Sequence, residues 1–115
     1  MAKIPDTARV ALEHRLNTRH TERWHGLRTL AVRYRGEFAY LDATFTDEDT
    51  DAEPYPLCRL RYTGLADRWG FAIYLDSRAA YEDSFLPTGQ PTGTPEQALD
   101  CACGLYLADP TAWTQ

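Results

Sequence analysis

Four stretches between residues 29 and 75 alternate apolar and polar side chains with a period of two, and turn-forming residues separate them. That period places successive side chains on opposite faces of an extended strand. The pattern predicts strands over 29–35, 38–46, 56–63 and 68–75, with a shorter edge strand over 81–86. A series of short strands of this kind is typical of an antiparallel meander. The 68–75 stretch is apolar on both faces, which predicts a central place in the sheet.

A helix is expected before the first strand. Residues 7–22 contain neither glycine nor proline, and Asp6 precedes them as the expected N-cap. The apolar stripe is thin and continues into arginines on the same side of the helix: Ala8, Leu12, Leu16, Arg19 and Arg23. The helix is therefore expected either to be anchored weakly or to pack mainly through arginine stems.

A second helix is expected over residues 94–108. Thr94, Pro95 and Gln97 form the sequence signature of a capping box, with proline at the first helical position. Five apolar residues share one side of this helix: Ala98, Leu99, Ala102, Leu105 and Tyr106. That side is expected to cover one face of the sheet.

Together these elements predict one α+β domain over residues 1–115, built in two layers. It would contain a basic N-terminal helix (1–25), a meander of four or five strands (27–86) and a C-terminal helix (94–108). A chain of 115 residues is long enough to bury one hydrophobic core.

Charge is divided unevenly along the chain. Residues 1–36 contain eight basic and three acidic side chains, 8 − 3 = +5, whereas residues 37–115 contain four arginines and fourteen carboxylates, 4 − 14 = −10. The two parts sum to the net charge of −5. This division favours either docking on a polyanion or internal neutralisation between the two parts.

The strand alternation assigns a candidate binding surface. If the C-terminal helix covers the face that carries Leu30 and Val32, the opposite face presents arginines interleaved with rings: Arg33, Arg35, Phe38, Tyr40, Arg59 and Arg61. Such a surface suits single-stranded nucleic acid, because bases stack on rings and guanidinium groups contact phosphates. The N-terminal helix would add phosphate contacts through four arginines: Arg9, Arg15, Arg19 and Arg23.

The same residues have a structural alternative. The sheet arginines can pair with Asp42, Asp76 or Glu37, and the N-terminal helix can lie over this face. The net charge of −5 also opposes a polyanion at long range.

The three cysteines are expected to be small, buried apolar residues. Cys101 and Cys103 are two residues apart, which is about 200° around a helix axis, so the two thiols cannot bind one metal ion. Cys58 can meet Cys101 at the interface between sheet and helix. An odd number of cysteines without a disulfide pattern favours a reducing compartment, and the expected location is cytoplasmic.

No catalytic, metal or cofactor site is expected. The three histidines, His14, His20 and His25, lack the spacing of a zinc site. The acidic segment 46–53 begins like a calcium loop, but Ala52 and Cys58 occupy the positions that require glycine and glutamate. It is therefore expected to be a solvated loop, and no serine or cysteine has a histidine near it in the sequence.

Residues 57–64, 68–75, 81–89 and 93–113 resemble a group of short uncharacterised actinobacterial proteins. The resemblance extends over about residues 23–113 and implies one intact domain, without catalytic or binding residues to carry over. A meander followed by Thr-Pro-Glu-Gln-Ala-Leu and a helix is also similar in pattern to HicB-type antitoxins and to arm-type DNA-binding domains of tyrosine integrases. That likeness implies an accessory role linked to nucleic acid.

The sequence thus favours a non-catalytic binding module that binds a protein partner or a second copy of itself. The alternative is a nucleic-acid-binding module that uses the arginine and aromatic sheet face, and a small enzyme ranks third. A membrane partner is not expected, because no apolar run is long enough to cross a bilayer and no secretory signal is recognised.

Overall fold

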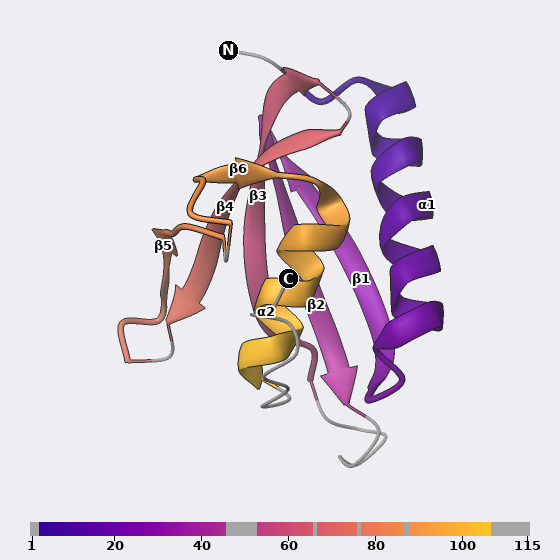
Figure 1. Ribbon diagram of the computed structural model, residues 1–115, viewed down its shortest axis with the longest axis vertical. Coiled ribbons are helices and arrows are strands. Elements are labelled where there is room, and N and C mark those ends of the chain that lie inside the picture. Colours follow the sequence, from indigo (N-terminus) through magenta and orange to yellow (C-terminus); the bar gives the residue numbers. More distant parts are fainter. Residues whose placement is uncertain (1–2, 46–52, 66, 76, 87, 107–115) are drawn as a thin grey trace.

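The computed structural model describes residues 3–45, 53–65, 67–75, 77–86 and 88–106, and its fold is α+β (Figure 1). The two helices are α1 (Asp6–Arg23) and α2 (Pro95–Tyr106). The six strands are β1 (Leu27–Arg35), β2 (Phe38–Phe45), β3 (Tyr55–Leu65), β4 (Arg68–Leu75), β5 (Ala80–Asp83) and β6 (Thr92–Gly93). The predicted antiparallel sheet with an N-terminal and a C-terminal helix is confirmed.

The strands follow the order β1-β2-β3-β4-β5, and every pair is antiparallel. The two-residue strand β6, which the sequence did not predict, pairs with β4 at Trp69 and Gly70. The prediction that β4 is the central strand is wrong, because β3 lies in the middle. β4 is apolar on both faces for another reason: its inner face carries Trp69 and Phe71, and its outer face carries the small residues Gly70 and Ala72. β1 forms one edge of the sheet, and no strand pairs with its outer side within the described residues.

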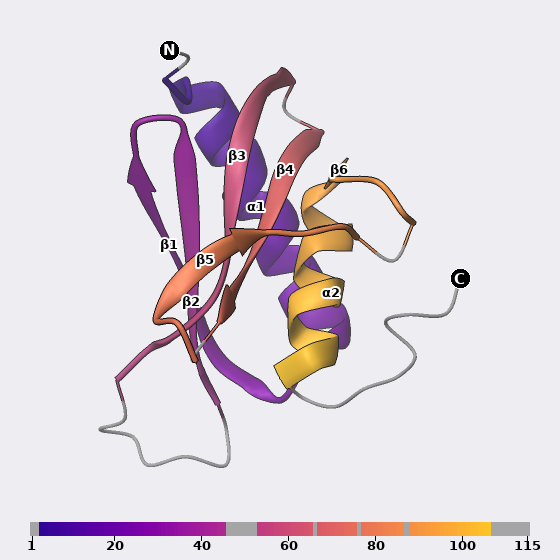
Figure 2. The same ribbon diagram turned by 90° about the vertical axis from the view of Figure 1, so that its left-hand side faces the viewer.

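Both helices lie on the same side of the sheet (Figure 2). The hydrophobic core fills the space between them and the inner sheet face, where the alternation directs apolar side chains of β2, β3 and β4. A register shift next to Leu41 turns two successive residues of β3, Leu57 and Cys58, into the core. The molecule is therefore a two-layer structure in which the helices cover one face of the sheet only.

The N-terminal helix α1 is part of the core. Ala8, Leu12 and Leu16 are buried, and the two leucines are fully inaccessible to solvent. The predicted cap is wrong: Pro5 is at the N-cap position without a side-chain hydrogen bond, and Asp6 is the first helical residue. A carboxylate there still interacts favourably with the helix dipole.

The start of α2 confirms the capping box. The Gln97 N–H donates to the Thr94 hydroxyl at 3.2 Å, and the Thr94 N–H donates to Gln97 Oε1 at 3.0 Å. A Cβ atom on Gly93 would meet the ends of the Gln97 and Leu86 side chains, so a larger residue there would displace the Gln97 amide oxygen that accepts from the Thr94 N–H.

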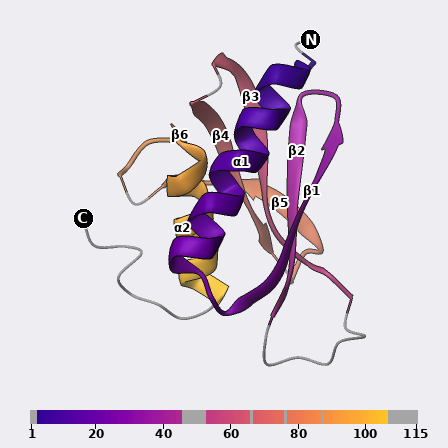
Figure 3. The same ribbon diagram turned by 90° about the vertical axis from the view of Figure 1, so that its right-hand side faces the viewer.

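Burial of α2 extends around the helix, because α2 packs on the sheet and also against α1, which lies beside it on the same sheet face (Figure 3). Every residue from 98 to 104 is buried, including Asp100. The sequence predicted one apolar stripe; the second buried side faces α1. The predicted end of the helix near residue 108, the acidic segment 46–52 and Asp76 lie outside the described residues. Neither described helix has the length and apolarity that crossing a membrane requires.

Candidate binding surface on the open face of the sheet

The arginines of α1 contact carboxylates of α2 on the helix side of the molecule. Arg15 donates two hydrogen bonds to Glu96, at 2.8 and 2.7 Å. Arg19 contacts Asp100 in the same bidentate way, at 3.0 and 2.6 Å. Arg23 reaches an oxygen of Asp100 at 3.2 Å. Of the two interpretations of the uneven charge, internal neutralisation describes these three arginines.

Asp100 is the centre of this contact. Its carboxylate also accepts a hydrogen bond from the indole N–H of Trp24 at 2.8 Å, and the residue is 8% exposed. The hydrogen bond from Arg19 to Asp100 raises the pKa of Arg19, so this guanidinium is held in its charged form. One buried carboxylate therefore accepts four hydrogen bonds from three residues, two in the C-terminal part of α1 and one directly after it.

The fourth arginine of α1 also contacts the protein itself. Arg9 lies over the Tyr34 ring, with its guanidinium carbon 4.6 Å from the ring centroid, and its Nε donates to the carbonyl of Ile4 at 3.2 Å. The Tyr34 hydroxyl in turn donates to Glu13 at 2.8 Å. The ten arginine and aromatic residues predicted as one site are therefore divided into two groups on different sides of the sheet.

The second group occupies the sheet face that points away from both helices. We define this open face by the six predicted residues and four more that the structure adds: Arg33, Arg35, Phe38, Tyr40, Arg59, Arg61, Asp42, Tyr74, Tyr81 and Asp83. Pairing register places Tyr40 between Arg33 and Arg59, and Phe38 between Arg35 and Arg61. No described helix or strand covers this face (Figure 2).

Guanidinium groups lie over the aromatic rings of the open face. Arg59 is 4.4 Å from the centroid of Phe38 and 5.7 Å from that of Tyr81. Arg33 is 5.2 Å from the centroid of Tyr40. Tyr40 and Tyr81 meet edge to face at 5.3 Å. These contacts restrain the side chains in fixed orientations, and each cation–π contact contributes about 0.5–1 kcal/mol at an exposed site.

The charges of the open face are only partly paired. Arg33 contacts Asp42 at 2.6 Å, as the structural alternative anticipated, and Asp42 is buried. Arg59 contacts Asp83 at 3.4 Å, and the Asp83 side chain is 93% exposed, so this ion pair is weak. Arg35 and Arg61 are exposed and form no ion pair with any described residue.

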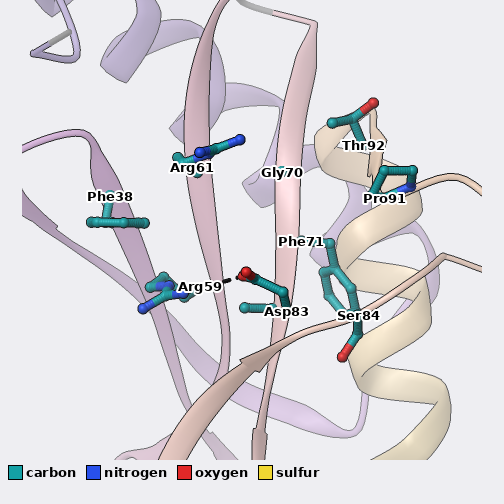
Figure 4. Close-up of a pocket in the computed structure, with 10 residues that line it drawn as sticks. Phe38, Arg59, Arg61, Gly70, Phe71, Asp83, Ser84, Pro91 and Thr92 are labelled. Atoms are coloured by element: carbon teal, nitrogen blue, oxygen red, sulfur yellow. Dashed lines mark hydrogen bonds and ion pairs between the residues drawn. The ribbon is translucent and has the colours of Figure 1, made fainter. Parts of the chain in front are cut away.

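A hollow of about 240 Å³ opens on this face, beside the Arg59–Asp83 pair (Figure 4). Its floor is the outer side of β4, where Gly70 and Ala72 leave room. Arg59 and Arg61 of β3 border it on one side. The last residue of β5, the residue after it, the residue before β6 and the first residue of β6 border it on the other: Asp83, Ser84, Pro91 and Thr92.

The sequence did not indicate the part of the open face contributed by β5. Tyr81 and Asp83 reach the face because β5 pairs with β4 over residues 80–83, whereas the sequence predicted a strand over 81–86. Burial raises the pKa of Tyr81 to about 12, and Asp42 acts in the same direction, so its hydroxyl remains protonated. The sequence did contain a signal for the hollow. The outward positions of the 68–75 stretch are occupied by Gly70 and Ala72, and the outward positions of the preceding strand by Arg59 and Arg61.

The cysteines form no nucleophilic or metal-binding group. Cys58, Cys101 and Cys103 are all buried free thiols. Burial raises the pKa of Cys58 well above its usual range, and Cys103 and Cys101 add to the effect. Raised pKa values keep them protonated and unreactive. Within the described residues, no group of three or more histidine, cysteine or acidic side chains is arranged to hold a metal ion.

The fold and this surface define a small α+β module with one helix-covered and one open sheet face. Comparison with protein-family models, curated proteins and solved structures finds no significant match for the chain.

Proposed function

We propose that this protein is a non-catalytic binding module that docks a partner protein on the open face of its sheet. The observation that carries the proposal is the uncovered network of arginines and rings described above. Tyrosine and arginine dominate the energetics of protein–protein interfaces, because they offer large contact areas together with hydrogen-bond donors. Rings and guanidinium groups that already hold one another lose little side-chain entropy on binding.

Charge indicates the surface that such a partner presents. The open face carries four arginines and two aspartates, 4 − 2 = +2, within a chain of net charge −5. An acidic segment of the partner complements this local excess of positive charge. The overall negative charge limits long-range attraction, so the complementarity acts at contact distance.

Nucleic acid is the second candidate, favoured by Arg35 and Arg61, which lie beside aromatic rings and form no ion pair within the part of the chain that the structure describes. Two features weigh against it. Bases stack on exposed ring faces, but Arg59 lies over Phe38 and Arg33 lies over Tyr40. Three of the four arginines of α1 that would have added phosphate contacts are engaged with α2, and the fourth, Arg9, lies over the Tyr34 ring.

A photo-crosslinking amino acid at position 35 tests the proposal in cells that produce the protein. The matched control carries the same group at position 10, where Val10 is 69% exposed on α1. We expect protein adducts of discrete mass from position 35 only, insensitive to nuclease and lost when Tyr40 is also changed to alanine. An adduct of twice the chain mass identifies the partner as a second copy. Adducts that nuclease removes, or equal yields at both positions, contradict the proposal.

A further inference from the structure

We infer that the hollow on the open face receives a carboxylate from an acidic segment of the partner, held jointly by Arg59 and Arg61. This inference rests on the proposed function and specifies the chemistry of its contact. It follows from the volume of the hollow, from the placement and contacts of the two guanidinium groups, and from the weak Arg59–Asp83 ion pair at its border.

The size of the hollow suits a side chain. Its volume is about 240 Å³. Pockets for drug-sized molecules occupy roughly 300–1,000 Å³, and one water accounts for about 30 Å³. The space therefore accepts one or two side chains of a partner. It exists because Gly70 and Ala72 are small: a Cβ on Gly70 would already touch the side chain of Arg61, at 3.4 Å from its Cβ.

The two guanidinium groups are placed to share one anion. Arg59 and Arg61 are alternate residues of β3, so they point to the same face with Cα atoms about 7 Å apart. Arg59 is held over the ring of Phe38 and near that of Tyr81. Arg61 is exposed and has no ion-pair partner within the described residues. Arg59 is thus oriented by the rings before an anion binds. The charge of Arg61 is not neutralised by an ion pair with any described residue.

Asp83 occupies the place that the incoming carboxylate would take. Its oxygen lies 3.4 Å from Arg59 Nη2, longer than the 2.7–2.9 Å typical of charge-assisted hydrogen bonds. With 93% of its side chain exposed, Asp83 can leave Arg59 at little cost. The internal pair is therefore exchangeable for a carboxylate that reaches both arginines.

Two neutral hydroxyl groups that line the hollow already form hydrogen bonds within the protein. The Ser84 hydroxyl donates to the carbonyl of Glu82 at 2.9 Å, and in Figure 4 it points away from the two arginines. The Thr92 hydroxyl accepts from Arg68 at 3.1 Å, which adds a third guanidinium at the rim. The Thr92 O–H remains a neutral donor, but the charged donors around the hollow are guanidinium groups, which favours an anionic group.

The test is a titration of the full-length, isotope-labelled protein, followed by NMR, with the probe peptide acetyl-(Asp-Glu)₄-amide. We expect shifts at residues that border the hollow, and at least fivefold weaker binding for Arg59→Gln and for Arg61→Gln. Asp83→Asn, which removes the internal competitor, should tighten binding about twofold. The matched control is Arg78→Gln, an exposed arginine paired with Glu82, which should bind like the unmodified chain. Dispersed amide spectra confirm that each variant is folded.

Three outcomes overturn the inference. If Arg59→Gln and Arg61→Gln leave peptide binding unchanged, the two arginines do not hold a carboxylate. That outcome does not contradict docking of a partner on the open face. Equal or tighter binding of inorganic phosphate or of a twelve-residue oligothymidylate, lost in the same variants, replaces the carboxylate by phosphate chemistry. Absence of peptide binding removes the inference, whereas the crosslinking experiment decides the proposed function separately.

Discussion

Asp100 is a single buried carboxylate on which several contacts between the two helices depend. It joins α1 to α2 by accepting hydrogen bonds from Arg19, Arg23 and Trp24, which lie 76 to 81 residues away in the chain. Two guanidinium groups share this single negative charge. Arg19 and Arg23 keep about a third of their side chains exposed. Water therefore screens part of the charge, and much of the stabilisation is expected to come from hydrogen-bond geometry.

Replacing Asp100 by asparagine should lower the free energy of unfolding by about 2 kcal/mol, because two partly exposed guanidinium groups lose the counter-charge and hydrogen bonds of a buried carboxylate. Urea denaturation followed by circular dichroism measures the change. The matched control is Arg78→Ala, which removes an exposed i,i+4 pair and should cost less than about 0.5 kcal/mol. Equal effects of the two changes would contradict the central role of Asp100.

Single residues of the open face were predictable only in part. Strand alternation assigned Arg33, Arg59 and Arg61 to one face, because a period of two fixes the direction of each side chain. The same rule cannot say which carboxylate a guanidinium meets. Asp83 reaches Arg59 through the register of β5, a property of tertiary packing and not of local sequence.

At the scale of elements, the N-terminus of α2 is fixed by local chemistry. Thr94→Ala removes the side-chain half of the capping box and should destabilise the protein by about 1 kcal/mol. Thr94→Ser keeps the hydroxyl and should stay within a few tenths of a kcal/mol of the unmodified chain. Thermal unfolding of both variants measures the difference. Two equally destabilised proteins would show that packing at this position, and not the hydrogen bond, is responsible.

The buried thiols of α2 and β3 predict loss of stability in alkaline solution. Burial raises the pKa of Cys101 from 9.0 to about 11. Above pH 9 the unfolded chain releases this proton while the folded chain retains it, so the free energy of unfolding falls as pH rises from 9 to 11. Cys101 alone should contribute a loss of about 1 kcal/mol between pH 9 and pH 10.

Urea unfolding between pH 7 and pH 10.5 tests this dependence. The unfolding free energy should be nearly constant up to about pH 8.5 and then decline. Cys101→Ala should reduce the slope above pH 9. A slope that this variant leaves unchanged would assign the decline to other groups, such as Tyr81 with its pKa of about 12.

For the whole molecule, the position of α1 determines what each sheet face can do. The sequence left open whether this helix lay over the arginine face, because a stripe of three apolar residues does not identify the surface it packs on. The structure places Leu12 and Leu16 in the core beside α2 and leaves the other face open. The bidentate arginine contacts with Glu96 and Asp100 explain why a thin stripe suffices.

Leu12→Ala should therefore destabilise the entire domain, by about 3 kcal/mol, because it leaves a cavity at a fully buried site. Val10→Ala on the exposed side of the same helix is the matched control and should be close to neutral. Denaturation followed by both far-UV and near-UV signals should give one coincident transition. A helix that melts before the sheet would contradict a shared core.

The outer edge of β1 has a consequence for how copies of this protein behave when they are crowded. Over its nine residues the strand carries Arg28, Arg33 and Arg35 and no acidic residue, and all three arginines are exposed. Two such edges that approach each other bring like charges together, which discourages strand-by-strand fibril growth. The arginines of this edge therefore disfavour pairing between the β1 strands of two copies.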